Sequence, residues 1–204
     1  GISIFQITII ESISLIVCLL LELPWGIVAD KIGYRNTLIF CCVLYFVSKI
    51  VFWRADGFAA FLLERIMLSI VIAGISGVDV SVLYLSSEKG ESQKIFGIYN
   101  NLQTVGLLFA SFVYSLFVKE SYRIAGFFTV ISYGIAAILA FGLVEVKNAD
   151  RTQKANPKDL LAIVQSIITN KRSLLFLAGV ALLNETHQTV TVFLNQLQYV
   201  RCGL

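Results

Sequence analysis

The sequence has few charged residues for its length. Lys, Arg, Asp and Glu make up 14% of its 204 residues, whereas soluble domains contain about 25%. Hydrophobic residues make up 57%, above the usual proportion of about 45–50%. A soluble domain does not carry this balance, so we interpret the chain as an all-α, polytopic transmembrane helix bundle.

The sequence also lacks the motifs of several functional classes. It has no Gly-Lys-Ser/Thr phosphate-binding loop, so this stretch lacks the motif that would bind ATP to drive transport. Its one histidine, His187, has no cysteine nucleophile beside it, and the four cysteines lack metal-type spacing. We therefore expect no enzyme activity, no cofactor and no metal. The net charge of +3 lies in loops and reports membrane topology rather than nucleic-acid binding.

One short polar segment separates two long apolar runs and reads Gly26-Ile27-Val28-Ala29-Asp30-Lys31-Ile32-Gly33-Tyr34-Arg35-Asn36. We expect a helix to end here and the chain to reverse, with Gly33 in the positive-φ conformation of a tight turn. Gly26 would let another helix approach closely. Asp30 would precede the next helix, where a carboxylate suits the exposed N–H groups. Lys31 and Arg35 favour the cytoplasmic side.

This segment resembles the signature loop between the second and third helices of the major facilitator superfamily. The family pattern is Gly, three residues, Asp, a basic residue, any residue, Gly and two basic positions. Gly26, Asp30, Lys31, Gly33 and Arg35 match it, and Tyr34 replaces the first closing basic residue. In the family this loop helps to lock the inward gate. The resemblance implies transport of a small-molecule substrate by alternating access of two helical halves.

Six apolar runs predict transmembrane helices. Each holds about 18 or more mostly apolar residues, enough to cross about 30 Å of hydrocarbon. They lie near residues 3–25, 37–54, 59–86, 95–118, 123–145 and 173–195. On the family plan they resemble the second to seventh helices, so we expect a partial fold of this family. The chain starts with Gly and stops just after a span, which we interpret as an internal fragment or a truncated product.

A polar linker divides the sequence into three parts. Residues 1–146 form the N-terminal-half helices, 147–172 a cytoplasmic linker, and 173–204 the start of the C-terminal half. Within the linker, Asn156 and Pro157 suit the start of a helix, and apolar residues follow at helical spacing. We expect an amphipathic helix on the cytoplasmic surface, similar to the family's central loop.

The distribution of Lys and Arg predicts orientation. Loops 26–36, 87–94 and 147–172 together hold ten of these residues, and the connections on the opposite side hold four. Positive charge favours the cytoplasmic side, so we place these three loops in the cytoplasm of a multi-pass plasma-membrane protein.

Charged residues inside spans are functional candidates, because charge within hydrocarbon is costly unless it is paired or hydrated. Glu11 and Arg65 lie roughly 10 Å and 9 Å below the outer face, at the rise of a helix. We expect Arg65 to pair with Glu11 or with a substrate group; a structural ion pair is the alternative. Arg65 also resembles the fourth-helix arginine that is linked to proton coupling in the family's antiporters, although Ser69 stands where that motif has Gly.

Other candidates have weaker signals. Asp79 could gate or relay protons, or could hydrogen-bond near Ser76 and Ser81. We expect the Lys49 side chain to extend towards the outer membrane surface, and we expect Glu64 to be interfacial. In the sixth span, Glu185 could carry a proton and His187 titrates near neutral pH, with a packing role as the alternative for the histidine.

Small residues recur every four positions in the third span and again in the fourth, which predicts close helix packing. They are Ser69, Ala73, Gly77 and Ser81, then Gly106 and Ala110.

These features favour secondary transport of a small solute, with proton-coupled efflux of a drug or metabolite as the first hypothesis. The expected partners are a small-molecule substrate, a coupling proton and the lipid bilayer. Uptake or facilitated diffusion is the alternative within transport, and a non-transporting, truncated membrane protein is the alternative outside it.

Overall fold

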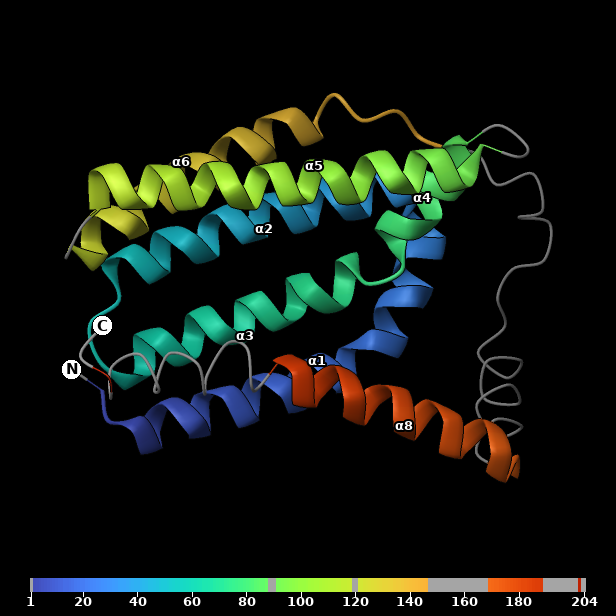
Figure 1. The fold of residues 1–204 in the computed structure, drawn as a ribbon, viewed down its shortest axis with the longest axis horizontal. Helices are drawn as coiled ribbons and strands as arrows, with labels where there is room; N and C mark the ends of the chain where they lie inside the picture. The colour runs from blue at the N-terminus through green and yellow to red at the C-terminus, as the bar shows by residue number, and fades with distance from the viewer. Residues whose placement is uncertain (1, 88–90, 119–120, 147–168, 189–201, 203–204) are drawn as a thin grey trace. The chain divides into compact units, whose positions relative to one another are not determined.

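A computed structural model describes residues 2–87, 91–118, 121–146, 169–188 and 202, and this part of the chain is helical (Figure 1). The chain divides into two compact units, residues 1–154 and 155–204, and α8 belongs to the second. In order, the elements are α1 (Ile4–Ile32), α2 (Tyr34–Arg54), α3 (Phe58–Ile75), α4 (Val78–Ser86), α5 (Ser92–Val113), the π-helical η1 (Tyr114–Val118), α6 (Tyr122–Ala140) and α8 (Lys171–Gln188).

Five stretches of the described residues are long and apolar enough to cross a membrane. They are Ile4–Glu22, Tyr34–Arg54, Phe58–Ser86, Ser92–Val118 and Arg123–Ala140. They confirm the expected all-α membrane bundle and correspond to the first five expected spans. The sixth expected span is described only as far as Gln188, within α8, which is not among the five.

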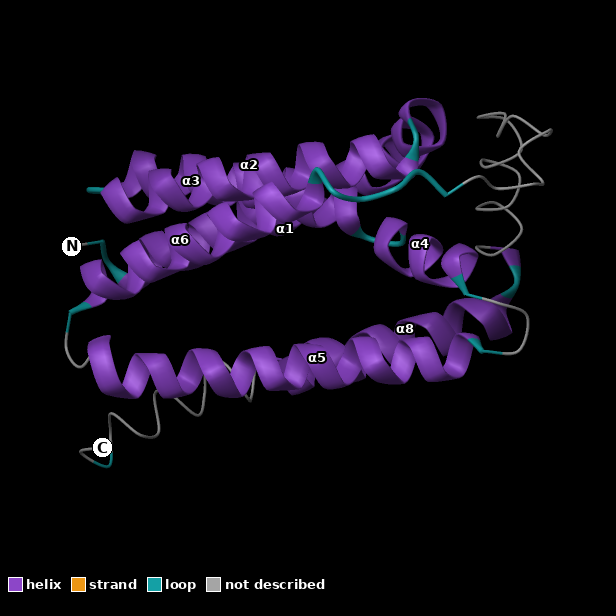
Figure 2. Cartoon of the chain, turned by 90° about the horizontal axis from the view of Figure 1, so that it is seen from above, coloured by secondary structure: helices purple, strands orange, loops and turns teal. Residues whose placement is uncertain are grey.

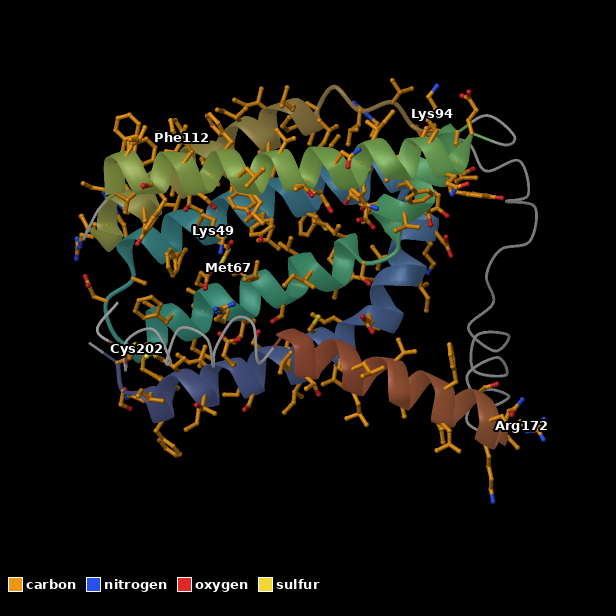
Figure 3. The ribbon with its side chains drawn as sticks, in the orientation of Figure 1. Lys49, Met67, Lys94, Phe112, Arg172 and Cys202 are labelled. Atoms are coloured by element: carbon orange, nitrogen blue, oxygen red, sulfur yellow. The ribbon has the colours of Figure 1, made fainter. Side chains whose placement is uncertain are left out.

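The core of the first unit lies where α3 packs against α1 and α2, and where α2 packs against α6. Cys41, Val71 and Ala73 are fully or almost fully buried there. By contrast, α5 buries none of its residues, and Figure 2 shows it outside the layer that holds α2 and α3. Many of its apolar side chains, including Phe112, labelled in Figure 3, are exposed, as expected of a multi-pass membrane protein in lipid.

The first helix continues through the segment that we expected to form the loop. α1 runs to Ile32, so Gly26, Asp30 and Lys31 are helical, and only Gly33 separates α1 from α2. Gly33 has φ 95°, which confirms the expected positive-φ turn. A lone glycine such as Gly26 costs a helix only about 1 kcal/mol, too little to end a long apolar helix.

Ser3 and Gln6 form a capping box that fixes the start of α1. Pro24 lies inside the helix and removes one backbone N–H, which accounts for the bend of α1 visible in Figure 1.

The third expected span is broken. α3 ends at Ile75 and α4 begins at Val78, because Gly77 adopts the left-handed conformation with φ 78°. The stripe of small residues therefore packs only in α3, where Ser69 and Ala73 are buried, while Gly77 is exposed. Glycine's freedom at positive φ thus outweighs the packing role that its spacing suggested.

Two glycines of α6, rather than those expected in the fourth span, allow close helix packing. A side-chain carbon at Gly126 would lie 3.2 Å from Trp53, and one at Gly134 would lie 3.1 Å from Phe46, both on α2. Gly106 has no such neighbour, and Ala110 is exposed. α6 also ends at Ala140 rather than at 145, so Glu145 follows the helix. The amphipathic helix expected near 156–168 lies outside the described residues.

Candidate functional site: four linked charges between three helices

The expected pair between α1 and α3 forms. Arg65 Nη2 lies 2.7 Å from Glu11 Oε1, within ion-pairing distance, and the two side chains are 40% and 27% exposed. The helical rise had placed both residues at one depth, and the packing of α3 against α1 brings them together. The pair thus joins two membrane-spanning helices through opposite charges.

A second and more deeply buried pair joins α2 to α3. Lys49 Nζ lies 2.7 Å from Glu64 Oε1, and the side chains are 13% and 2% exposed. Figure 3 labels Lys49 beside α3. The expectation that Lys49 would extend outward is therefore wrong, and Glu64 lies buried at the contact between α2 and α3. A buried carboxylate needs a counter-charge, and Lys49 supplies it.

Two aromatic rings also flank the Lys49 ammonium. Nζ lies 5.3 Å from the ring centre of Tyr45 and 5.5 Å from that of Phe52, distances at which a cation is attracted to a ring face. Both rings belong to α2, so they hold the lysine head group against its own helix while it pairs with Glu64.

The two pairs form one chain of alternating charge. Glu64 Oε2 faces Arg65 Nε at 3.9 Å, while the other oxygen of the same carboxylate contacts Lys49. The order is therefore Glu11, Arg65, Glu64 and Lys49, with no net charge. This neutrality lowers the cost of placing four charges within membrane-spanning helices.

Ser69 adds a polar contact one helical turn beyond Arg65. Its Oγ lies 2.8 Å from Ser14 Oγ and 2.9 Å from the carbonyl oxygens of Ser14 and Arg65. A glycine here, as in the family motif, would lack this link between α3 and α1. The departure from the motif thus has a structural role beside the charge chain.

The segment around Gly33 makes a second polar cluster. The backbone N–H groups of Tyr34 and Arg35 donate to the Glu145 carboxylate at 3.1 and 3.2 Å. Arg35 in turn donates from Nε to the carbonyl of Leu143 at 2.6 Å and from Nη2 to that of Phe141 at 3.2 Å. An anion at the start of α2 and a cation at the end of α6 both match the helix dipoles.

Glu145 occupies the role that we had expected of Asp30. Asp30 lies in the last turn of α1 rather than before α2, and it is exposed, as is Lys31. A side-chain carbon added at Gly26 would meet no atom within 4 Å among the described residues, so the close helix approach expected there stays a prediction. Of the five matched residues, Arg35 makes these contacts, and Gly33 forms the turn that precedes it.

Asp79 lies beside the break between α3 and α4. Tyr99 of α5 donates its hydroxyl to Asp79 Oδ2 at 3.2 Å, and the N–H of Val80 donates to Oδ1. The expected hydrogen-bonded environment is present, but its partner is Tyr99 rather than Ser76 or Ser81. Asp79 is thus a link between α4 and α5.

Glu185 and His187 lie near the end of α8. Their side chains are outside what the structure describes, so their roles remain predictions.

Sequence reasoning missed the Lys49–Glu64 pair and the Glu145 contacts. A usable signal existed for the first: Lys49 lies five residues before the end of α2, and Glu64 lies six residues after the start of α3. The depth argument that paired Glu11 with Arg65 applies equally to these two residues. The role of Glu145 depends on where α6 ends, which the apolar run did not indicate.

A comparison with models of protein families finds one match that spans nearly the whole chain. Residues 1–201 match the model described as Major Facilitator Superfamily.

Proposed function

The chain belongs to the major facilitator superfamily, whose members transport solutes across membranes, and on this premise we propose that it serves proton-coupled efflux of a small drug-like or metabolite molecule. Transport would proceed by alternating access, in which two helical halves expose one site to either side of the membrane in turn. Residues 1–146 would supply most of the first half, residues 147–172 the linker, and residues 173–204 the first helix of the second half.

The ion pair between Glu11 and Arg65 is the observation that carries this proposal. Charged groups inside hydrocarbon are rare and mark ion pathways, and this pair lies within two candidate spans. Both side chains are partly exposed, so neither is sealed in the core. Glu11 would alternate between its bond to Arg65 and a bound proton or cationic substrate, and Arg65 would bind anionic groups when released.

Three further residues would extend the proton pathway. Asp79, linked to Tyr99 beside the break at Gly77, would relay protons towards the cytoplasm. Glu185 and His187 would act from the second half, where the family's seventh helix lines the substrate path.

The signature segment would serve the inward gate. Tyr34 and Arg35, directly after Gly33, are hydrogen-bonded to Glu145, Leu143 and Phe141 at and beyond the end of α6, which fixes this corner of the first unit. Asp30 and Lys31 are exposed on the last turn of α1, where they would contact the second half of the transporter.

We also propose a plasma-membrane location with residues 26–36, 87–94 and 147–172 in the cytoplasm. The excess of Lys and Arg in these segments supports this orientation.

The test is pH-gradient-driven transport in proteoliposomes that contain the protein. Ethidium, a lipophilic cation, is the probe, and its movement is followed by fluorescence with and without an imposed proton gradient. We expect gradient-dependent exchange that is lost in Glu11→Gln and in Arg65→Ala, and reduced in Glu185→Gln. Asp56→Asn is the matched control, because Asp56 pairs with Arg123 in an exposed contact at the molecular surface.

The outcomes separate the alternatives. Ethidium movement that ignores the gradient would favour facilitated diffusion, and movement into the compartment that corresponds to the cell interior would favour uptake. Full activity in both Glu11→Gln and Arg65→Ala would contradict the assigned site. No movement of ethidium or of any tested metabolite would favour a non-transporting membrane protein.

A further inference from the structure

Arg65 lies between two carboxylates that differ in their other partners. Its Nη2 is 2.7 Å from Glu11 Oε1, and its Nε is 3.9 Å from Glu64 Oε2. Glu11 has no second cation among the described residues, whereas Glu64 is bound at its other oxygen by Lys49 at 2.7 Å. The guanidinium therefore bonds closely to Glu11 and only loosely to Glu64.

Lys49 accounts for this asymmetry. An almost fully buried carboxylate must find a counter-charge, because an unpaired charge in the interior is strongly destabilising. Lys49 supplies that charge from α2, where the rings of Tyr45 and Phe52 flank its ammonium. Without Lys49, the nearest cation left to Glu64 is Arg65, and Glu64 would then compete with Glu11 for it.

From this geometry we propose that Lys49 and Glu64 are positioning residues that set how tightly Arg65 holds the Glu11 carboxylate, and so how readily Glu11 takes up a proton. The inference rests on the proposed role of Glu11 as the proton carrier. The charged groups that face this site from α1, α2 and α3 are Glu11, Lys49, Glu64 and Arg65, and the ring of Tyr45, a titratable residue, lies beside Lys49.

The two positioning residues have opposite expected effects. Replacing Glu64 by Gln leaves Arg65 with Glu11 alone, so the ionised form of Glu11 is favoured. Replacing Lys49 by Met turns Glu64 towards Arg65, so Glu11 loses part of its counter-charge and is protonated more readily. If the Lys49–Glu64 pair served only to pack α2 against α3, the two substitutions would not change the protonation of Glu11 in opposite directions.

The experiment measures how fast dicyclohexylcarbodiimide modifies Glu11 in the purified protein at neutral pH, with mass spectrometry to separate Glu11 from other carboxylates. The reagent consumes protonated carboxyl groups. Relative to the unaltered protein, we expect modification at least about threefold faster in Lys49→Met and at least about threefold slower in Glu64→Gln. Lys49→Arg, which keeps the charge, should restore the original rate.

Two further variants keep the test decisive if Lys49→Met does not fold. The double variant Lys49→Met with Glu64→Gln removes both charges and should return close to the original rate. In an Arg65→Gln background, Glu64→Gln should no longer change the rate, because Glu64 acts through Arg65. Arg123→Met, at an exposed ion pair, is the control that should leave Glu11 unaffected.

Shifts in the same direction for both single variants, no shift in either, or an undiminished effect of Glu64→Gln without Arg65 would each overturn the proposal. The rate of modification reports on Glu11 whether or not a solute moves. If the modification rates are as expected but ethidium is not transported, the transport proposal alone is rejected. If ethidium is transported but the modification rates do not change as expected, only this inference is rejected.

Discussion

Glu64 is the most deeply buried charged side chain of the described residues, with 2% of its surface exposed. Its position is stable only because each carboxylate oxygen faces a cation, Lys49 at one side and Arg65 at the other. Every buried polar side-chain atom in the described part of the chain likewise has a hydrogen-bond partner. The position of each buried polar side chain in this part of the protein is therefore explained by the group with which it forms a hydrogen bond or an ion pair.

Removing Lys49 should destabilise the protein. We expect Lys49→Met to lower the free energy of unfolding by about 3–5 kcal/mol, because it leaves the Glu64 charge buried and poorly paired. The double variant Lys49→Met with Glu64→Leu should recover most of this loss, since the buried charge is gone. Unfolding in mixed micelles with increasing dodecyl sulfate measures both. Equal losses in the single and double variants would show that the charge itself is not the cause.

Gly33 and Gly26 offer a matched pair of substitutions. Gly33→Ala should cost about 1–3 kcal/mol, because φ is 95° there and the added carbon would lie 2.8 Å from Glu145 Oε2. Gly26→Ala should be neutral or stabilising by about 1 kcal/mol, since Gly26 is helical and nothing lies within 4 Å. The same micelle unfolding assay compares them. A larger loss at Gly26 would contradict the observed end of α1.

At the scale of elements, the helices of the first unit are tied at their ends as well as along their faces. The start of α2 receives a carboxylate from beyond α6, and the end of α6 receives the guanidinium from the first turn of α2. Each contact places charge where the partner helix has unsatisfied backbone groups. Together with Gly126 and Gly134 against α2, they make α2 and α6 one packed pair.

Glu145→Gln should loosen this pair. The variant keeps an oxygen acceptor but loses the charge that faces the start of α2, so we expect a loss of about 1–2 kcal/mol. Arg35→Met should cost a similar amount through the carbonyls of Leu143 and Phe141. A double-mutant cycle on unfolding measures the coupling between the two residues, which we expect to be favourable because both fix one corner. Strict additivity would show that the two contacts act independently.

At the scale of the whole molecule, the sequence predicted the membrane class, the family and five of the spans. These follow from the length of apolar runs, which is a property of single segments. Helix ends were harder to predict. Gly26 resembles a helix breaker but lies within α1, whereas Gly77 resembles a packing residue but ends α3. Local propensity alone does not distinguish these two glycines, of which Gly26 is helical and Gly77 has φ 78°.

The site was predicted in part. Glu11 and Arg65 could be paired by counting helical rise, since both lie in spans with clear outer ends. The same count applies to Lys49 and Glu64, which lie five residues before the end of α2 and six residues after the start of α3, and it was not made for them. Glu145 required the position of the end of α6, which the apolar run did not indicate.

Topology is testable with cysteine substitutions at the two ends of the bundle. Lys31→Cys and Asp56→Cys place thiols at exposed positions near the start and beyond the end of α2. If the segment 26–36 is cytoplasmic, an impermeant maleimide applied to intact cells should label Asp56→Cys and leave Lys31→Cys unmodified until the cells are lysed. The native cysteines are replaced by serine or alanine in both variants. Labelling of Lys31→Cys in intact cells would reverse the proposed orientation.

The most direct test of the central claim, that Glu11 exchanges a proton for substrate beside Arg65, is the release of protons when substrate binds. Ethidium is added to the purified protein in weakly buffered detergent solution, at a pH low enough to populate protonated Glu11, and the pH is followed with a soluble indicator dye. We predict that the unaltered protein and the Asp56→Asn control release protons and that Glu11→Gln does not. Equal proton release from Glu11→Gln would contradict the account.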